Sequence, residues 1–202
     1  MPVSVSNHSG SNHSGSDLLA PGAHGAVGGE PVRIALRSCD VVQVLARKGR
    51  AGDVAAALLG ALGLVLPGPG HAADGRGASA LWVQPEGWFV VAPRGADGAL
   101  ASAIKAACGD AASVIDQSHG RAVVSISGTR AAWVLAKSCR VDLHPSAFGP
   151  GRVASTQLFH LAATLHQTDA VPSFDLIVFS TFLRSFLESL THAAEETGYV
   201  VA

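Results

Sequence analysis

The segment from Val114 to Cys139, VIDQSHGRAVVSISGTRAAWVLAKSC, decides the fold class. Two runs rich in β-branched and apolar residues, SVIDQS and RAVVSIS, flank His119 and Gly120, which predicts two strands joined as a hairpin. We expect Gly120 to take a positive φ at the hairpin tip. Gly128 and Thr129 then open a predicted helix over RAAWVLAKSC. Two strands followed by one helix form the unit from which we expect the chain to be built.

The same arrangement continues in both directions from this segment. Upstream, strand patterns occur in PVRIALRS, in VVQVLAR and in both halves of ALWVQPEGWFVVAP; downstream they occur in RVASTQLF, LAATLHQT and SFDLIVF. Strands therefore come in pairs between single helices and do not alternate with them one for one. This order predicts an α+β fold with mostly antiparallel sheets and packed helices.

The predicted helices have recognisable ends. Asp53 is the expected N-cap of VAAALLGAL, which ends at Gly63, and Asp97 is the expected cap of GALASAIKAAC, which Gly109 closes. A last helix starts at Thr181. The expected apolar stripes are Ala132, Leu135 and Ala136 in the third helix, and Phe182, Phe186 and Leu190 in the last. The stretch LPGPGHAADGRGAS is predicted to be a loop.

Composition divides the chain into a tail and a globular part. Residues 1–30 are rich in Ser, Asn, His and Gly, with SNHSG repeated, and we expect them to form a disordered tail. Residues 31–202 are expected to form a single compact unit of two lobes, approximately 31–110 and 111–202. The tail histidines His8, His13 and His24 lack a rigid frame that would make them a specific metal site.

Charge and hydropathy exclude several classes of function. Lys and Arg number 14 against 15 Asp and Glu, so no basic excess is present to bind nucleic acid. The longest apolar run, Val54 to Leu66, is shorter than the roughly 20 residues of a membrane-spanning helix, and no secretory signal pattern precedes Arg33. Three widely spaced cysteines fit reduced structural thiols better than a disulfide framework. We therefore expect a cytoplasmic protein that contacts neither nucleic acid nor membrane.

The stretch KSCRVDLHP places Cys139, Asp142 and His144 close together in sequence. One interpretation is a thiol hydrolase site, which needs thiol and imidazole within hydrogen-bond reach. The simpler interpretation is a helix end: Lys137 and Arg140 lie where the C-terminus of a helix favours cations, and the following proline prevents the helix from continuing. We favour the helix end, with His144 in a turn or at an interface.

The stretch DQSHGR raises a similar question, because Asp116, Ser118 and His119 are the residue types of a hydrolytic triad. A hairpin tip explains them more simply, with Asp116 and Ser118 bonding local backbone groups. Loops also carry binding sites, so a channel role stays open. Trp82 and Trp88 lie in predicted strands, and like Trp133 they suit the core or an interface.

Several of these segments together resemble a known family. Val114 to Cys139 and Pro172 to Tyr199, the latter with the step Phe174-Asp175-Leu176, resemble the aminomethyltransferase and folate-binding superfamily. More narrowly, Ala80 to Pro93, Ser127 to Gly151 and Ser173 to Phe182 resemble the gamma subunits of heterotetrameric sarcosine oxidase. This narrower resemblance extends over roughly residues 32–199.

The resemblance implies an accessory, non-catalytic gamma subunit. Its complex would oxidatively demethylate sarcosine to glycine, producing hydrogen peroxide and passing the one-carbon unit to tetrahydrofolate. The resemblance further implies alpha, beta and delta subunits as partners, with FAD, FMN, NAD and tetrahydrofolate bound in those subunits. No catalytic, cofactor or metal residue is expected in this chain, and no GxGxxG or GxxxxGK[ST] fingerprint occurs in it.

Six residues are candidates for an interface or channel role. They are Trp82, Trp88, Ser118, His119, Arg121 and His144. The main alternative function is a stand-alone folate-binding protein of the same fold in one-carbon metabolism. A thiol hydrolase that uses Cys139 comes last.

Overall fold

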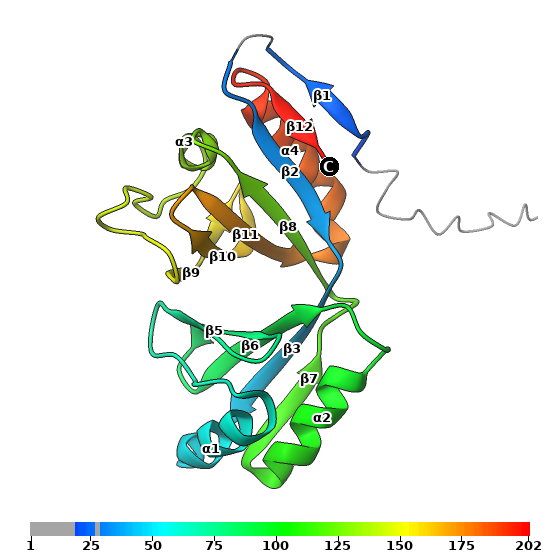
Figure 1. The fold of residues 1–202 in the computed structure, drawn as a ribbon, viewed down its shortest axis with the longest axis vertical. Helices are drawn as coiled ribbons and strands as arrows, with labels where there is room; N and C mark the ends of the chain where they lie inside the picture. Colours follow the sequence, from blue (N-terminus) through cyan, green and yellow to red (C-terminus); the bar gives the residue numbers. More distant parts are fainter. Residues whose placement is uncertain (1–18, 27–28) are drawn as a thin grey trace, which may run out of the picture.

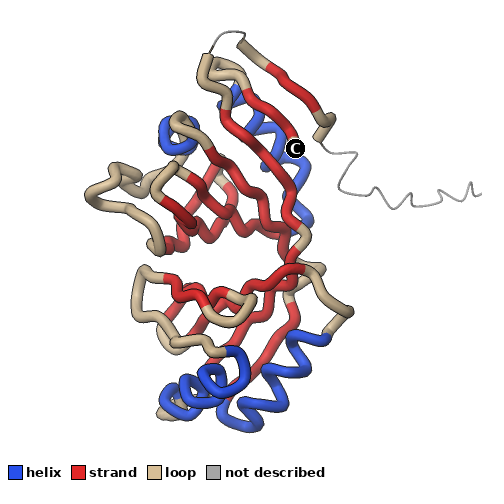
Figure 2. The backbone as a smooth tube through the Cα atoms, viewed as in Figure 1, coloured by secondary structure: helices blue, strands red, loops and turns tan. Residues whose placement is uncertain are grey.

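The computed structural model describes residues 19–26 and 29–202. Two sheets face each other across the middle of the molecule, and helices pack on their outer faces (Figures 1 and 2). One sheet has seven strands in the order β1-β12-β2-β8-β11-β10-β9, and the other has five in the order β4-β5-β6-β3-β7. All neighbouring strands are antiparallel except the pair of β12 and β2. The predicted α+β class with mostly antiparallel sheets is confirmed.

The seven-stranded sheet draws its strands from both ends of the chain. These are β1 (Gly22–His24), β2 (Val32–Arg37), β8 (Arg121–Ser127), β9 (Val153–Leu158), β10 (Leu161–Asp169), β11 (Ser173–Phe179) and β12 (Tyr199–Val201). Its helices are α3 (Ala131–Ala136) and α4 (Leu183–Ala194), the latter preceded by a 3-10 turn, Ser180–Phe182. Alternate residues of β11, among them Phe174 and Leu176, are buried in one core cluster with Phe186 and Leu190 of α4.

The five-stranded sheet lies within one continuous part of the chain. Its strands are β3 (Cys39–Ala46), β4 (Ala72–Asp74), β5 (Ser79–Gln84), β6 (Gly87–Pro93) and β7 (Ala112–Asp116). Helices α1 (Ala51–Leu62) and α2 (Ala99–Cys108) cover its outer face, and a 3-10 turn, Gly109–Ala111, leads from α2 into β7 (Figure 1). Val54 and Leu58 of α1 pack there with Ile104 of α2. These helices leave the opposite face of the sheet for contact with its partner sheet.

The predicted hairpin across His119 and Gly120 is wrong. Strand β7 pairs with β3, whereas β8 pairs with β2 and β11 in the other sheet. The turn between them therefore carries the chain from one sheet to the other. Its glycine, Gly120, has no positive φ and instead donates a backbone hydrogen bond of 2.9 Å to Gln117. The runs of β-branched and apolar residues identified both strands correctly but not their partners, which are distant in sequence.

Two predicted helix caps are also wrong, although the predicted ends hold. Helix α1 begins before Asp53, which lies in its first turn and forms an ion pair with Arg50. Gly98 occupies the N-cap of α2 with φ of 71°, and Asp97 contacts His119 instead. Gly63 ends α1 in the left-handed conformation, as predicted. A glycine cap avoids the steric cost of that conformation, whereas the two carboxylates contact the side chains of Arg50 and His119.

The apolar stripes of two helices differ from their predicted positions. Helix α3 is only six residues long and buries Ala131, Val134 and Leu135, leaving Ala136 exposed. In the last helix Phe186 and Leu190 are buried as predicted, but Phe182 is 49% exposed. Phe182 lies in the 3-10 turn ahead of α4, and its side chain therefore leaves the helical stripe.

Short strands occur in two segments predicted to lack structure. Strand β4 interrupts the predicted loop before Ser79, and β1 lies within the predicted tail. β1 pairs with β12, where His24 stacks on Tyr199 with ring centroids 5.1 Å apart. His8 and His13 fall outside the described residues. Three-residue strands carry too little alternation for a sequence pattern to identify them.

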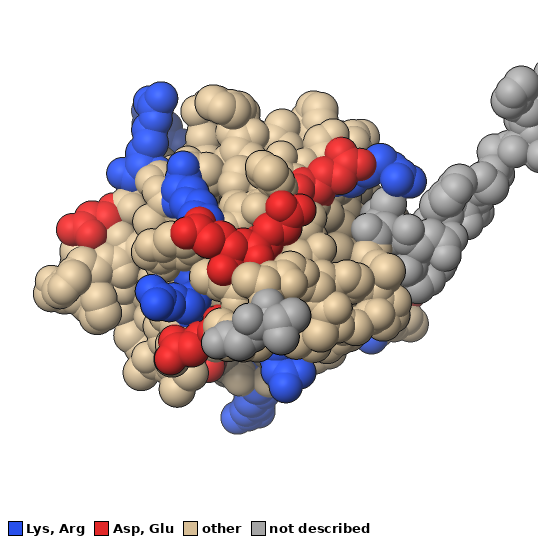
Figure 3. Space-filling view, turned by 90° about the horizontal axis from the view of Figure 1, so that it is seen from above, with Lys and Arg blue, Asp and Glu red and all other residues tan. Residues whose placement is uncertain are grey.

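The sheets do not divide at residue 110, because β2 belongs to the seven-stranded sheet and β7 to the five-stranded one. The two lobes as folding units stay a prediction. Within the described residues, no helix is long and apolar enough to cross a membrane. On the face seen in Figure 3, basic and acidic side chains are interspersed and most of the surface is uncharged.

Candidate functional site

The cleft between the two sheets is the candidate functional site. At its centre lies an apolar cluster to which both sheets contribute, including Val41 and Phe89 on one side and Val123 and Ile177 on the other. Two cavities border this cluster and share no lining residue. We call them the Arg37 cavity and the Arg121 cavity, each after an arginine that lines it.

The Arg37 cavity has a volume of about 440 Å³ and contains an internally paired charge. The guanidinium of Arg37, at the end of β2, forms an ion pair with the carboxylate of Asp175 on β11. The Asp175 side chain is 10% exposed, whereas that of Arg37 is 42% exposed. Burial raises the pKa of Asp175, and the neighbouring Arg37 acts in the opposite direction. The pair therefore keeps a carboxylate in an otherwise apolar strand.

His166 lines the same cavity, directly opposite Asp175 in the register of β10 and β11. It is 8% exposed, and burial lowers its pKa, while Asp74 partly opposes that shift. Asp74 accepts a hydrogen bond of 2.6 Å from the hydroxyl of Ser79. The imidazole is consequently neutral near pH 7 and presents one donor and one acceptor nitrogen.

The Arg121 cavity is larger, at about 710 Å³, and is bordered by both sheets. The guanidinium carbon of Arg121 lies 3.6 Å from the ring centroid of Phe179 and 5.3 Å from that of Phe89. Arg140, from the loop after α3, also lines it. Among the described residues neither arginine forms an ion pair. Burial lowers the pKa of Arg121.

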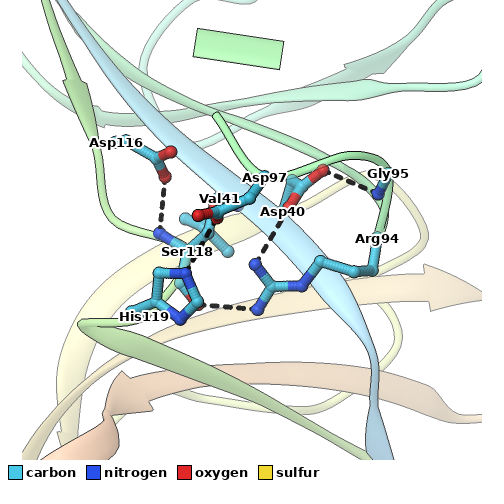
Figure 4. A network of polar contacts seen from close by, with 8 residues as sticks. All are labelled: Asp40, Val41, Arg94, Gly95, Asp97, Asp116, Ser118 and His119. Carbon is cyan, nitrogen blue, oxygen red and sulfur yellow. Dashed lines mark hydrogen bonds and ion pairs between the residues drawn. The ribbon is translucent and has the colours of Figure 1, made fainter. Parts of the chain in front are cut away.

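The turn that joins the sheets is held by a network of polar contacts (Figure 4). Ser118 is buried, and its Oγ accepts a hydrogen bond of 3.1 Å from the amide of Val41. Arg94 donates to the Ser118 carbonyl at 3.0 Å and to the buried carboxylate of Asp40 at 3.1 Å. Asp116 accepts from the Ser118 amide at 2.9 Å, and hydrogen bonding by Ser118, through its side chain and its backbone, lowers the pKa of Asp116. Ser118, Arg94, Asp40 and Asp116 each form a side-chain hydrogen bond to a backbone group, that of Asp40 being to the amide of Gly95 at 2.9 Å.

The predicted triad alternative is not assembled. The exposed ring of His119 contacts Asp97 at 2.9 Å, whereas the Ser118 hydroxyl faces Val41 (Figure 4). Asp116 bonds its own turn, as the simpler interpretation predicted, but the Ser118 side chain bonds a distant strand. A nucleophile needs its base within hydrogen-bond reach, and this geometry does not provide one.

The stretch around Cys139 has the geometry of a helix end. The His144 ring contacts the hydroxyl of Ser146 at 2.7 Å, and Asp142 accepts from the His144 amide at 2.9 Å. Burial raises the pKa of the Cys139 thiol, which disfavours the thiolate that a nucleophile needs. Lys137 donates to the carbonyl of Ala193 at 2.7 Å, so it contacts α4 instead of its own helix terminus.

The tryptophans occupy different environments. Trp88 is 7% exposed, and its indole donates to the carbonyl of Pro67 at 2.9 Å. Trp82 lies opposite Trp88 in the β5–β6 register and is half-buried. Trp133 is 39% exposed beneath the ammonium of Lys137, 4.0 Å from its ring centroid. Trp88 is thus a packing residue, and Trp82 and Trp133 reach the surface.

Sequence reasoning singled out Arg121 but missed Arg37, His166 and Asp175 as members of a site. A charged residue at the third position of SFDLIVF was the available signal, since Asp175 shares its strand face with Ile177. Nothing in the sequence indicates that its partner is Arg37, 138 residues away. Among residues 19–26 and 29–202, no cluster of three or more His, Cys, Asp and Glu could hold a metal ion.

The fold has a clear counterpart among solved structures. The glycine cleavage system aminomethyltransferase T from Bartonella henselae superimposes with a TM-score of 0.63 at 15% identity. The match covers 86% of this chain and 48% of that one, so this chain spans about half the length of that protein. The class defined here is thus a two-sheet α+β protein with part of the aminomethyltransferase fold.

More similar proteins narrow the class. A chain of heterotetrameric sarcosine oxidase from Corynebacterium sp. U-96, in complex with pyrrole 2-carboxylate, matches with a TM-score of 0.76 at 30% identity, covering 86% of this chain and 88% of that one. The sarcosine oxidase subunit gamma of Arthrobacter sp. is 38% identical over 72% of this chain and 71% of its own length. The corresponding protein of Corynebacterium sp. strain P-1 is 40% identical over 56% of each chain.

A model of the family described as "Sarcosine oxidase, gamma subunit family" matches residues 48–196. The chain belongs to this family, and the resemblance inferred from its sequence is confirmed.

Proposed function

We propose that this chain is the accessory, non-catalytic gamma subunit of a heterotetrameric sarcosine oxidase. The observation that carries the proposal is the match to a chain of such a complex over 86% of this chain and 88% of the other, at a TM-score of 0.76. A subunit that is similar in length and fold to its counterpart can occupy the same place in an assembly. The alternative of a stand-alone folate-binding protein is not favoured, because the curated relatives are subunits.

In this proposal the chemistry belongs to other subunits. The partners are alpha, beta and delta chains that carry FAD, FMN, NAD and tetrahydrofolate, in the cytoplasm. The complex converts sarcosine to glycine with oxygen, releasing hydrogen peroxide and transferring the one-carbon unit to tetrahydrofolate. A structural role for this chain agrees with two features of its site: the buried network at Ser118 positions backbone, and burial disfavours the Cys139 thiolate.

Four of the six candidate residues remain proposed interface or channel positions. His119 and His144 are exposed, Trp82 is half-buried, and Arg121 borders a cavity. Trp88 and Ser118 are buried within the chain, so any contribution they make is indirect, through packing and the turn between the sheets.

Co-expression with and without this chain tests the proposal. We expect the four chains to co-purify as a yellow complex that consumes oxygen with sarcosine, while this chain alone is colourless and inactive. Omitting this chain should lower the yield of assembled complex and the turnover per flavin. Unchanged assembly and turnover in its absence would contradict an accessory role, and sarcosine-dependent oxygen consumption by the isolated chain would contradict a non-catalytic one.

A further inference from the structure

The Arg121 cavity has an unbalanced charge. Two arginines line its volume of about 710 Å³, and none of its lining residues is acidic. A volume between about 300 and 1,000 Å³ is typical of small-molecule sites. The local charge of the cavity is therefore positive, although the whole chain has a net charge of −1.

The guanidinium of Arg121 is held in place by aromatic rings, but its charge has no counterion among the described residues. The rings of Phe179 and Phe89 hold its guanidinium, and its Nε is buried without a hydrogen-bond partner in the described part of the chain. A guanidinium stays charged at physiological pH, and its N–H donors point outward in its own plane. A partly buried charge without a counterion is costly, and a bound anion would offset this cost.

Further polar groups border the same cavity. Gln43 comes from the five-stranded sheet, whereas Gln157 and Thr164 come from the seven-stranded sheet. Among residues 19–26 and 29–202, none of these three side chains has a recorded hydrogen bond. Amide and hydroxyl donors that are free on both sides can complete the coordination of an anion that the arginines attract.

We propose that the Arg121 cavity binds a small molecule bearing a carboxylate or phosphate group, which Arg121 and Arg140 hold through charge-assisted hydrogen bonds. The planar fork of a guanidinium matches both anions, and two such forks together with neutral donors form a site for one anionic group.

Calorimetric titration of the full-length chain tests this site. The probes are inorganic phosphate and benzoate, at an ionic strength fixed with chloride, and benzamide serves as the neutral counterpart of benzoate. We expect at least one of the two anions to bind and benzamide not to bind. Phosphate alone, or benzoate alone, would identify which of the two groups the site prefers.

Substitutions localise the binding. Arg121→Gln and Arg140→Gln should each weaken anion binding by about tenfold or more, because each removes a hydrogen bond to a charged group. Arg184→Gln on α4 is the matched control, since Arg184 is exposed and lies outside the cavity. If Arg121→Gln impairs folding, as circular dichroism would show, the exposed Arg140 still provides the test. Absence of anion binding, or equal binding by wild type and the Arg140 variant, would overturn the proposal.

A second arm repeats the titration on the assembled complex, and this arm alone rests on the proposed function. We expect the anion to bind with similar affinity there. Binding by the free chain that disappears on assembly would mean that a neighbouring subunit fills the cavity, and would overturn a small-molecule site. Failure to assemble would count against the proposed function only, because the titration of the free chain does not depend on partners.

Discussion

The Arg37 and Arg121 cavities each contain an arginine of the same sheet, but only Arg37 is paired with a carboxylate. Strands β2 and β8 are neighbours, and Arg37 lies opposite Val123, two residues along β8 from Arg121. Both arginines therefore belong to the same face of the seven-stranded sheet. Strand β11 supplies the Asp175 carboxylate to one arginine and, four residues later, the Phe179 ring to the other.

The two arginines differ in the side chain that β11 places beside each guanidinium. The Asp175 carboxylate on β11 neutralises Arg37, so the charge of this arginine is compensated within the chain. At the other end of the same strand an aromatic face fixes the direction of Arg121 without neutralising its charge. Arg37 is therefore neutralised within the chain, whereas Arg121 has no ion pair among the described residues.

Arg37→Gln should destabilise the protein more than any other substitution considered for these two cavities. Removing Arg37 leaves Asp175 buried without its counterion, and we expect the free energy of unfolding to fall by about 1–3 kcal/mol. The range lies below that of a fully buried pair because Arg37 is partly exposed to solvent. Urea unfolding of the full-length chain measures the change.

Two variants separate this effect from a general loss of charge. Adding Asp175→Asn to Arg37→Gln should restore part of the stability, because the buried charge is removed as well. Arg33→Gln on the same strand is the matched control, since Arg33 is exposed and no ion pair is recorded for it in the described chain. A change within about 0.5 kcal/mol is expected there. A double variant no more stable than the single one would show that the pair is not the cause.

The fold could be predicted from the sequence where local pattern decides it. Alternation identified β2, and runs of apolar and β-branched residues identified β3 and β8. The helix end at Gly63 was also predicted correctly, because it depends only on local backbone conformation. The partners of β7 and β8 could not be predicted in this way, because they are distant in sequence: β7 pairs with β3, and β8 pairs with β2 and β11. The turn between them is likewise held from a distance, since Ser118 binds Val41 across 77 residues. The same limit applies to the cleft, where Arg121 was a candidate but its two phenylalanines lie in distant segments.

A second test uses the pH dependence of the Arg37 cavity. Burial lowers the pKa of His166 below its ordinary value of 6.5, so the unfolded chain binds that proton more readily than the folded chain. The stability that His166 contributes is fully present above pH 6.5 and is lost as pH falls below it. One proton limits the loss to at most about 1.4 kcal/mol per pH unit. Urea unfolding at pH values above and below 6.5 measures it.

His166→Gln should remove this part of the pH dependence, whereas His119→Gln, at an exposed site, should retain it. Asp175 acts in the opposite sense: burial raises its pKa, so its contribution is present at low pH and is lost as pH rises. Asp175→Asn should therefore make the acid-side loss steeper. An unchanged pH dependence in the His166 variant would mean that another group is responsible.

Arg121→Gln, in chloride buffer without carboxylate or phosphate, should change the stability of the protein least. The variant loses the contact with Phe179, which is worth about 0.5–2 kcal/mol, but it also removes the cost of a partly buried charge without a counterion. These terms oppose each other, so we expect the free energy of unfolding to change by less than about 1 kcal/mol. Urea unfolding beside Arg37→Gln gives a direct comparison of the two cavities. A loss as large as that of Arg37→Gln would show that the fold already compensates Arg121, and the contrast between the two arginines would disappear.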